Sequence, residues 1–171
     1  IEDKWIINKL NKTIKTMEDN LDKYELGLAL EAIYDFIWDE FCDWYIEMVK
    51  PRLYYSDSST SKLAAQYTLN YVLKNSLKLL HPFMPFVTSE IYSKLICFGT
   101  EDLMISNWPT LRDEFAFDKE EATVEKLKKL IVEIRNIRTK MNVHPAKKSK
   151  LMIISNDIEN EIKEAEEFLS K

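Results

Sequence analysis

The sequence predicts a mainly α-helical protein, an antiparallel helix bundle with a small C-terminal α/β appendage. Apolar residues recur at steps of three and four over most of the chain, as in helices that bury one face. They make up 46% of the 171 residues, enough for the core of one compact domain. The appendage is expected because a short apolar run, 151–154, follows Pro145 and fits a strand.

The first two predicted helices cover about residues 7–24 and 30–48. The apolar residues of the first line up on one face; they are Ile7, Leu10, Ile14, Met17, Leu21 and Tyr24. The chain is expected to turn near Gly27. The second helix is apolar around so much of its circumference that we expect it at the centre of the bundle. Pro51 should end it, because proline lacks an amide hydrogen and its ring clashes with the preceding turn.

The rest of the chain predicts three more helices and a truncated last one. A polar loop spans 56–61, and a third helix spans about 62–80 with a buried set that includes Leu63, Tyr67 and Tyr71. Pro85 suits the first turn of a fourth helix through Leu95, and 96–117 reads as irregular. A fifth helix covers about 119–141, and Asp157 caps the last. We therefore expect a bundle at 1–117 and a second part at 118–171.

Several function classes are disfavoured by composition. With two glycines the chain lacks the loops that cradle phosphates, and two histidines and two cysteines, spread apart, do not supply a zinc site. No pair of residues predicts acid–base or nucleophilic catalysis. His81, beside Pro82, is expected to be structural. No apolar run approaches the roughly 20 residues that span a bilayer, and the first residues do not form a signal peptide, so we expect a soluble, cytoplasmic protein.

One face of the first helix has the residues that RNA binding requires. Trp5 points about 150° away from the centre of the apolar stripe when residues are placed at 100° intervals. Asn8, Lys9 and Lys12 share that face. An exposed indole beside an amide and two ammonium groups can stack an unpaired base and neutralise its phosphates. The alternative is that the chain preceding Ile1 covers Trp5.

Charge is distributed unevenly along the chain. Residues 118–156 contain 10 basic and 5 acidic residues in a protein whose net charge is −5. Within this stretch, Arg135 and Arg138 of the fifth helix could bind phosphates. Their alternative partners are the carboxylates of the second helix, where acidic residues recur every fourth position: Glu31, Asp35, Asp39, Asp43 and Glu47. We interpret this ridge as a solvated face rather than a cation or partner site.

Several sequence segments together resemble bacterial valyl-tRNA synthetases, a family of class I aminoacyl-tRNA synthetases. The segments are Asp3-Lys4-Trp5, Leu10-Asn11, Tyr34-Asp35-Phe36-Ile37-Trp38, Phe41-Cys42-Asp43-Trp44-Tyr45-Ile46-Glu47, Lys50-Pro51, His81-Pro82-Phe83-Met84-Pro85-Phe86, Glu90-Ile91-Tyr92, Trp108-Pro109 and Ile134-Arg135-Asn136-Ile137-Arg138. The run from Phe41 to Tyr45 is the most specific. Isoleucyl- and leucyl-tRNA synthetases share the bundle and the His-Pro-Phe element but usually differ in that run.

The resemblance implies the helical anticodon-binding domain of such an enzyme, with tRNA(Val) and the remainder of the synthetase as partners. It implies that Trp5 matches an anticodon-stacking aromatic residue and that Lys9 matches a basic position. The catalytic motifs of the family are absent from these 171 residues, so ATP and magnesium would be used elsewhere in the parent chain, and this part would hold no cofactor. The coiled-coil arm of the family would follow residue 171. We expect a non-catalytic, monomeric RNA-binding module; the alternatives are a protein-interaction bundle or the equivalent isoleucyl or leucyl domain.

Overall fold

The computed structural model describes residues 1–54, 59–95, 102–144, 147 and 152. The chain forms two compact units, Ile1–Asp118 and Lys119–Lys171. Regular structure within the described residues is helical, which confirms the predicted helix bundle. The expected strand at 151–154 and the helix after Asp157 lie outside the described residues, apart from Met152. The α/β appendage therefore stays a prediction.

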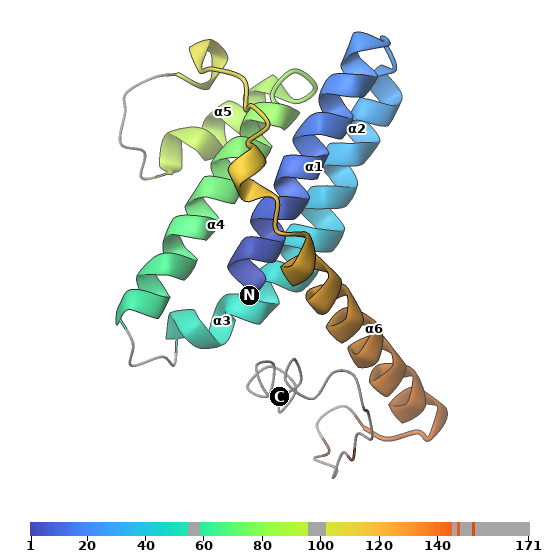
Figure 1. The fold of residues 1–171 in the computed structure, drawn as a ribbon. Coiled ribbons are helices and arrows are strands. Elements are labelled where there is room, and N and C mark those ends of the chain that lie inside the picture. The colour runs from blue at the N-terminus through green and yellow to red at the C-terminus, as the bar shows by residue number, and fades with distance from the viewer. Residues whose placement is uncertain (55–58, 96–101, 145–146, 148–151, 153–171) are drawn as a thin grey trace. The chain divides into compact units, whose positions relative to one another are not determined.

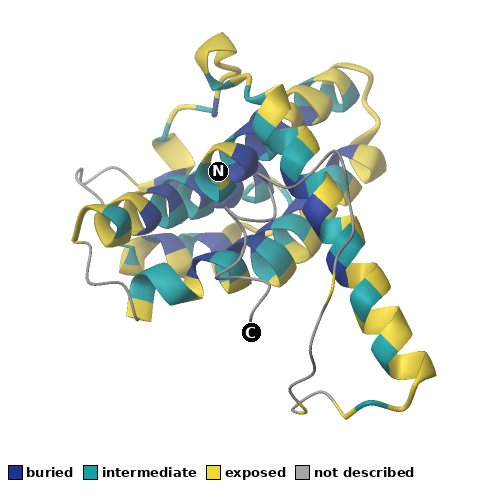
Figure 2. Cartoon of the chain, turned by 60° about the horizontal axis from the view of Figure 1, so that its bottom comes forward, coloured by how far each residue is buried: buried dark blue, intermediate teal, exposed yellow. Residues whose placement is uncertain are grey.

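The centre of the first unit is helix α1, Glu2–Asp22, which lies between α2, Leu26–Asp35, and α4, Ser59–Leu80 (Figure 1). Buried residues run along the sides of the helices that face one another (Figure 2). On α1 they include Ile6, Leu10, Ile14 and Met17, which recur at steps of four and three. The expectation that the second helix occupies the centre is wrong, because α1 contacts helices on both sides.

The second helix is one continuous rod in three parts. Helix α2 passes directly into a π-helical segment, η1, Phe36–Tyr45, and then into α3, Ile46–Tyr54. Phe36, Phe41 and Tyr45 are the buried residues of η1, at steps of five and four. The i→i+5 hydrogen bonds of a π-helix widen each turn, so residues spaced by five and four positions lie on one face. In an α-helix the same residues would be spread around the axis. With the α-helical period applied to the sequence, this spacing distributes the apolar residues around the whole circumference of the second helix.

Pro51 does not end the helix, which continues to Tyr54. The prediction was wrong because a proline in the last turns of a helix removes only one of the hydrogen bonds that remain there. The following residue, Arg52, is held from outside the helix by two carboxylates of α1, Glu2 and Asp3, at 2.7 and 2.8 Å. These contacts fix the turn after the proline.

The turn between α1 and α2 is made by Tyr24 rather than Gly27. Tyr24 adopts a left-handed backbone, φ 59°, and its side chain is 89% exposed. The backbone N–H of Tyr24 donates to Leu21 O and that of Glu25 donates to Asn20 O, at 2.9 and 2.8 Å. These are the bonds that close a helix with a left-handed residue after its cap. Gly27 lies in the first turn of α2.

Helices α4 and α5, Pro85–Lys94, form a hairpin, and proline begins α5 as predicted. His81 Nδ1 lies 2.8 Å from Thr88 Oγ1, which confirms the expected structural role of this histidine in the turn. The predicted buried set of α4 was wrong at Leu63 and Tyr67, which are exposed, because small and polar residues share the side of α4 that faces the core. The buried residues there are Ala65, Thr68, Val72, Ser76, Leu77 and Leu79. After α5, the described chain contains two short 3₁₀ turns, η2, Leu103–Ile105, and η3, Asp113–Phe115.

Helix α6, Asp118–Lys140, forms the described part of the second unit. Its buried residues, Val124, Leu127 and Ile131, follow helical spacing, whereas the apolar residues Ile137 and Met141 nearer its end are exposed. Asn142, at φ 52°, ends the helix in a left-handed conformation. No helix in the described part of the chain combines the length and apolar character that a membrane span needs.

Candidate nucleic-acid interface

The side of α1 that carries Asn8 and Asn11 is covered by residues 112–118, the segment that leads into α6. Asn11 Nδ2 donates to Arg112 O and the backbone N–H of Arg112 donates to Asn11 Oδ1, both at 2.9 Å. Asn8 Oδ1 accepts from the backbone N–H of Phe117 at 3.1 Å, and its amide donates to Asp118 Oδ1 at 3.4 Å. The two buried asparagine amides thus find hydrogen-bond partners in the segment that covers them, as buried polar side chains require.

Trp5 is fully buried, with 0% of its surface exposed. The prediction that its indole projects from the bundle was therefore wrong. Placing the residues of a helix at 100° intervals locates its apolar face, and the opposite face is then assumed to be exposed. Helix α1 instead has buried residues on both faces: Leu10 and Ile14 on the predicted stripe, and Asn8 and Asn11 under the 112–118 segment. A ring sealed in this way offers no face on which a base can stack.

The two predicted lysines of α1 have carboxylate partners; Lys12 is exposed and Lys9 is partly buried. Lys12 Nζ lies 2.8 Å from Asp118 Oδ1, and both side chains are mostly exposed. Lys9 Nζ lies 3.4 Å from Glu40 Oε1. The pKa of Asp118 is lowered by the hydrogen bonds from Lys12 and Asn8. Exposed ion pairs contribute little to stability, so an RNA phosphate can replace the carboxylate beside Lys12 at low cost.

An aromatic surface lies beside Lys12, on α4 and the 112–118 segment. Tyr71 and Phe115 meet edge to face, with 6.0 Å between ring centroids, and Phe115 and Phe117 stack at 6.3 Å. Tyr67 lies one turn before Tyr71 on α4 and is 76% exposed. The two tyrosines are close enough to interact electrostatically. Burial raises the pKa of Tyr71, and Arg112 opposes the shift.

Two cations lie over these rings. The Arg112 guanidinium is 5.6 Å from the centroid of Phe115, and Lys4 Nζ is 5.3 Å from that of Phe117. Cation–π contacts at such distances hold positive charge at an aromatic surface. We call this surface the aromatic–cation face; it consists of Lys4, Lys12, Tyr67, Tyr71, Arg112, Phe115 and Phe117. Of its rings, Tyr67 is exposed and the others are partly exposed. Accessible aromatic rings interleaved with cations are suited to binding unpaired bases together with their phosphates.

The two predicted arginines belong to the second unit. Arg135 is an exposed residue of α6. Arg138 is half-buried, and its Nη2 donates to the carbonyl oxygens of His144 and Lys147, at 3.1 and 2.8 Å. These bonds tie the chain after α6 to the last turns of the helix. Arg138 therefore has a structural role.

Sequence reasoning missed the aromatic–cation face because its residues are far apart in the chain. Tyr67 and Tyr71 were assigned to the core of the third helix, and the segment 96–117 received no role. A signal was present in Phe115 and Phe117, two aromatic residues with alternating spacing in a segment expected to be irregular. Asn11 and Asn8 also marked it, since amides on an otherwise apolar helix often satisfy a neighbouring backbone.

Comparison with known proteins identifies the class to which this bundle belongs. Residues 3–153 match the family described as "Anticodon-binding domain of tRNA ligase". The chain belongs to this family.

The similar proteins point to one kind of tRNA ligase within this family. The chain is 43% identical to valine–tRNA ligase of Clostridium perfringens over 157 residues, which cover 92% of this chain and 18% of the relative. It is 42% identical to valine–tRNA ligase of Fusobacterium nucleatum over 172 residues, covering 99% of this chain and 19% of the relative. The same enzyme of Clostridium tetani is 40% identical over 171 residues. The chain thus spans about a fifth of the length of these relatives, and it is homologous to their anticodon-binding region.

Proposed function

We propose that the chain binds the anticodon loop of tRNA(Val) as the non-catalytic recognition module of a valine–tRNA ligase. The observation that supports this most directly is the exposed aromatic–cation face on a bundle of the anticodon-binding family. In this proposal an unpaired base stacks on Tyr67, next to the rings of Tyr71 and Phe115. Lys4, Lys12 and Arg112 neutralise the neighbouring phosphates.

The six residues predicted from sequence have different parts in this proposal. Lys12 contacts a phosphate within the aromatic–cation face, and Lys9 contacts another from α1. Arg135 is a separate phosphate-binding residue on α6. Asn8 acts indirectly, by holding the 112–118 segment that carries the rings. Arg138 holds the chain beyond α6. Trp5 supports the fold from inside the bundle.

The proposal also assigns roles beyond these residues. Attachment of valine, with ATP and magnesium, would take place in another part of a longer chain, and this part would contribute the choice of tRNA. The cytoplasm is the compartment that this role requires. The helix bundle needs no second copy to complete the aromatic–cation face, because all of that face's residues lie within one unit, so we propose a monomer.

Replacement of Tyr67 by alanine is expected to weaken binding of a valine anticodon stem-loop by about 5- to 150-fold, the equivalent of one lost base stack. Because Tyr67 is mostly exposed, its removal should leave the unfolding transition unchanged. The measurement is a titration of labelled stem-loop monitored by fluorescence anisotropy. Affinity should fall as salt rises, since each neutralised phosphate releases counterions.

Phe86→Ala is the matched control, because Phe86 is an equally exposed aromatic residue on α5, outside the aromatic–cation face. It should bind the stem-loop like the unsubstituted chain. Stem-loops of tRNA(Ile), or of tRNA(Val) with a changed central anticodon base, should bind more weakly. Equal loss in the Tyr67 and Phe86 variants, or affinity that does not change with salt, would contradict the proposal.

A further inference from the structure

A second exposed face of the first unit has a chemistry unlike that of the aromatic–cation face. It lies on α2 and η1 and combines a row of apolar side chains with a parallel row of carboxylates. We call it the acidic–aromatic face; it consists of Leu26, Leu30, Tyr34 and Trp38 in the first row and Glu31, Asp35, Asp39 and Asp43 in the second. All eight side chains are exposed. In both rows each residue follows the previous one by four positions.

The junction of an α-helix with a π-helix keeps these rows straight. In an α-helix, every fourth residue drifts around the axis in one direction, because four residues exceed one turn of 3.6. In the wider turns of the π form, four residues complete less than one turn, so the drift reverses. The rows begin in α2 and continue into η1. Two continuous stripes, one apolar and one anionic, therefore lie side by side on the surface of the rod.

Tyr34 and Trp38 form a preorganised anchor on this face. Their rings are stacked, with 6.4 Å between centroids and 10° between planes, yet the side chains are 59% and 58% exposed. Such large rings cover a wide apolar area, and tyrosine and tryptophan are the residues that most often dominate protein interfaces. Because each ring already restrains the other, little side-chain freedom remains to be lost on binding.

The charge of this region decides which kind of partner it fits. Residues 24–49 contain seven acidic residues and no basic or histidine residue. Within the described part of the chain, Glu31, Asp35, Asp39 and Asp43 have no ion-pair partner. The resulting negative potential repels RNA phosphates and attracts cations. A partner that also covers Tyr34 and Trp38 must combine positive charge with apolar side chains on one surface.

We propose that the acidic–aromatic face docks a basic amphipathic helix of a protein partner. The apolar side of that helix covers Trp38, Tyr34 and Leu30, while its flanking lysines or arginines pair with Asp35, Asp39 and Asp43. Complementary charge of this kind speeds association and selects against wrong partners. The docking site is separate from the proposed RNA site, which uses α4 and the 112–118 segment, so one chain can engage protein and tRNA at the same time.

The test uses a fluorescein-labelled synthetic peptide of leucine and lysine, about 18 residues or five helical turns long, in amphipathic order. A peptide of the same composition in shuffled order carries the same charge without an apolar side. We expect the amphipathic peptide to bind the 171-residue chain about tenfold more tightly than the shuffled peptide, as measured by fluorescence anisotropy. Equal affinity for the two peptides would overturn the proposal.

Variants locate the binding and separate it from RNA recognition. Trp38→Ala is expected to weaken binding of the amphipathic peptide by about tenfold or more, as for an interface anchor. The double variant Asp39→Asn, Asp43→Asn keeps the shape of the face and should also weaken binding and reduce its salt dependence. Tyr67→Ala is the matched control: it should leave peptide binding unchanged, so that a failure of the RNA proposal is distinguishable from a failure of this one.

Three further outcomes would overturn the proposal. The first is unchanged peptide affinity in both the Trp38 variant and the double aspartate variant. The second is loss of stem-loop binding in Trp38→Ala with peptide binding retained, which would assign the face to RNA. The third is a concentration-dependent dimer, measured by sedimentation, that dissociates in Trp38→Ala, which would assign the face to a second copy of the chain.

Discussion

Replacement of Trp5 by alanine is expected to lower the free energy of unfolding by about 3–5 kcal/mol. The indole is fully buried near the start of α1, and α1 packs against α2, η1 and α4. Alanine would leave a cavity that neighbouring helices can fill only in part, so both the transfer energy and the packing contacts are lost. Urea unfolding followed by circular dichroism measures the effect.

Trp38→Ala is the matched control for this prediction, because it removes the same side chain from an exposed position. Its loss of stability should be about 1 kcal/mol or less, the scale of a surface contact between two rings. Trp5→Phe keeps most of the buried ring and should bind the valine anticodon stem-loop like the unsubstituted chain. If Trp5→Ala unfolds at an unchanged urea concentration, the ring is not packed in the interior and direct stacking on RNA becomes possible again.

The predicted helices at 62–80, 85–95 and 119–141 were confirmed within a few residues, because helix formation depends mainly on local signals. α4 and α6 follow from apolar spacing, and α5 from a proline that suits the first turn of a helix. The π-helical segment was missed, since its step of five between Phe36 and Phe41 has no place in a search for the α-helical period. The effect of Pro51 was misjudged in part for a related reason: the turn that follows it is held by Arg52, whose carboxylate partners Glu2 and Asp3 lie 50 and 49 positions away in the sequence.

The surface of α1 could not be predicted from the sequence of α1. Asn11 and Arg112, which close the back of the helix, are 101 positions apart. No local pattern specifies which distant segment covers a helix, and a wheel assigns every residue outside the apolar stripe to solvent. The predicted site was therefore partly displaced: Lys12 stayed at the surface beside Asp118, while Trp5 and Asn8 became interior residues. The aromatic rings that replace Trp5 in the proposal come from α4 and the segment before α6.

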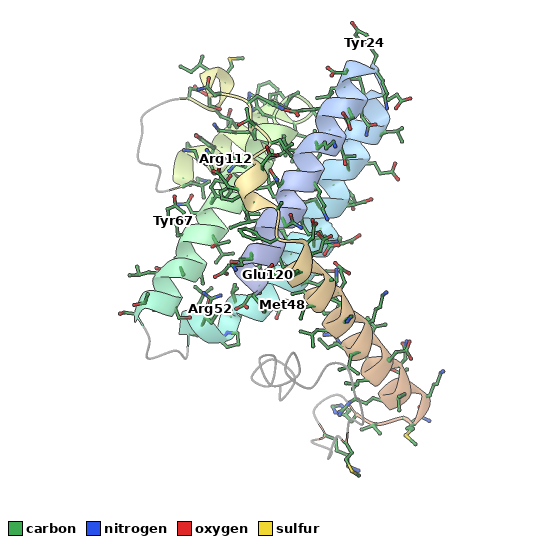
Figure 3. All side chains as sticks on the ribbon, in the orientation of Figure 1. Tyr24, Met48, Arg52, Tyr67, Arg112 and Glu120 are labelled. Atoms are coloured by element: carbon green, nitrogen blue, oxygen red, sulfur yellow. The ribbon has the colours of Figure 1, made fainter. Side chains whose placement is uncertain are left out.

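A second large effect is expected at the base of the bundle, where Arg52 joins three helices (Figure 3). Its guanidinium contacts Glu2 Oε1 at 2.7 Å and Asp3 Oδ2 at 2.8 Å, and its Nε donates to Ser61 Oγ at 3.0 Å. Asp3 Oδ1 also accepts from the buried Tyr45 hydroxyl at 2.7 Å. The network thus connects α1 with α3 and with the start of α4, and it ties the π-helical segment to the same carboxylate.

Arg52→Met is expected to destabilise the fold by about 2–4 kcal/mol, between the effects of breaking an exposed and a buried ion pair. The Arg52 side chain is mostly buried, and its loss leaves two carboxylates close together without their cation. Arg52→Lys keeps the charge but cannot contact both carboxylates in the same fork, so we expect an intermediate loss. Lys94→Met, which breaks the exposed pair with Glu90, is the control and should cost less than about 0.5 kcal/mol.

Acidification should reveal the same network. Burial alone would raise the pKa of Glu2, but the Ile1 amino group, a backbone hydrogen bond and Arg52 together lower it below the ordinary value. A carboxylate with a lowered folded-state pKa contributes stability that is complete above its unfolded pKa of about 4.3 and is lost as pH falls through the folded value. Between neutral pH and about pH 3, the unsubstituted chain should therefore lose more stability than Arg52→Met, in which part of that contribution is already absent. Urea unfolding of both proteins across this range makes the comparison, and parallel pH profiles would show that Glu2 and Arg52 do not interact in solution.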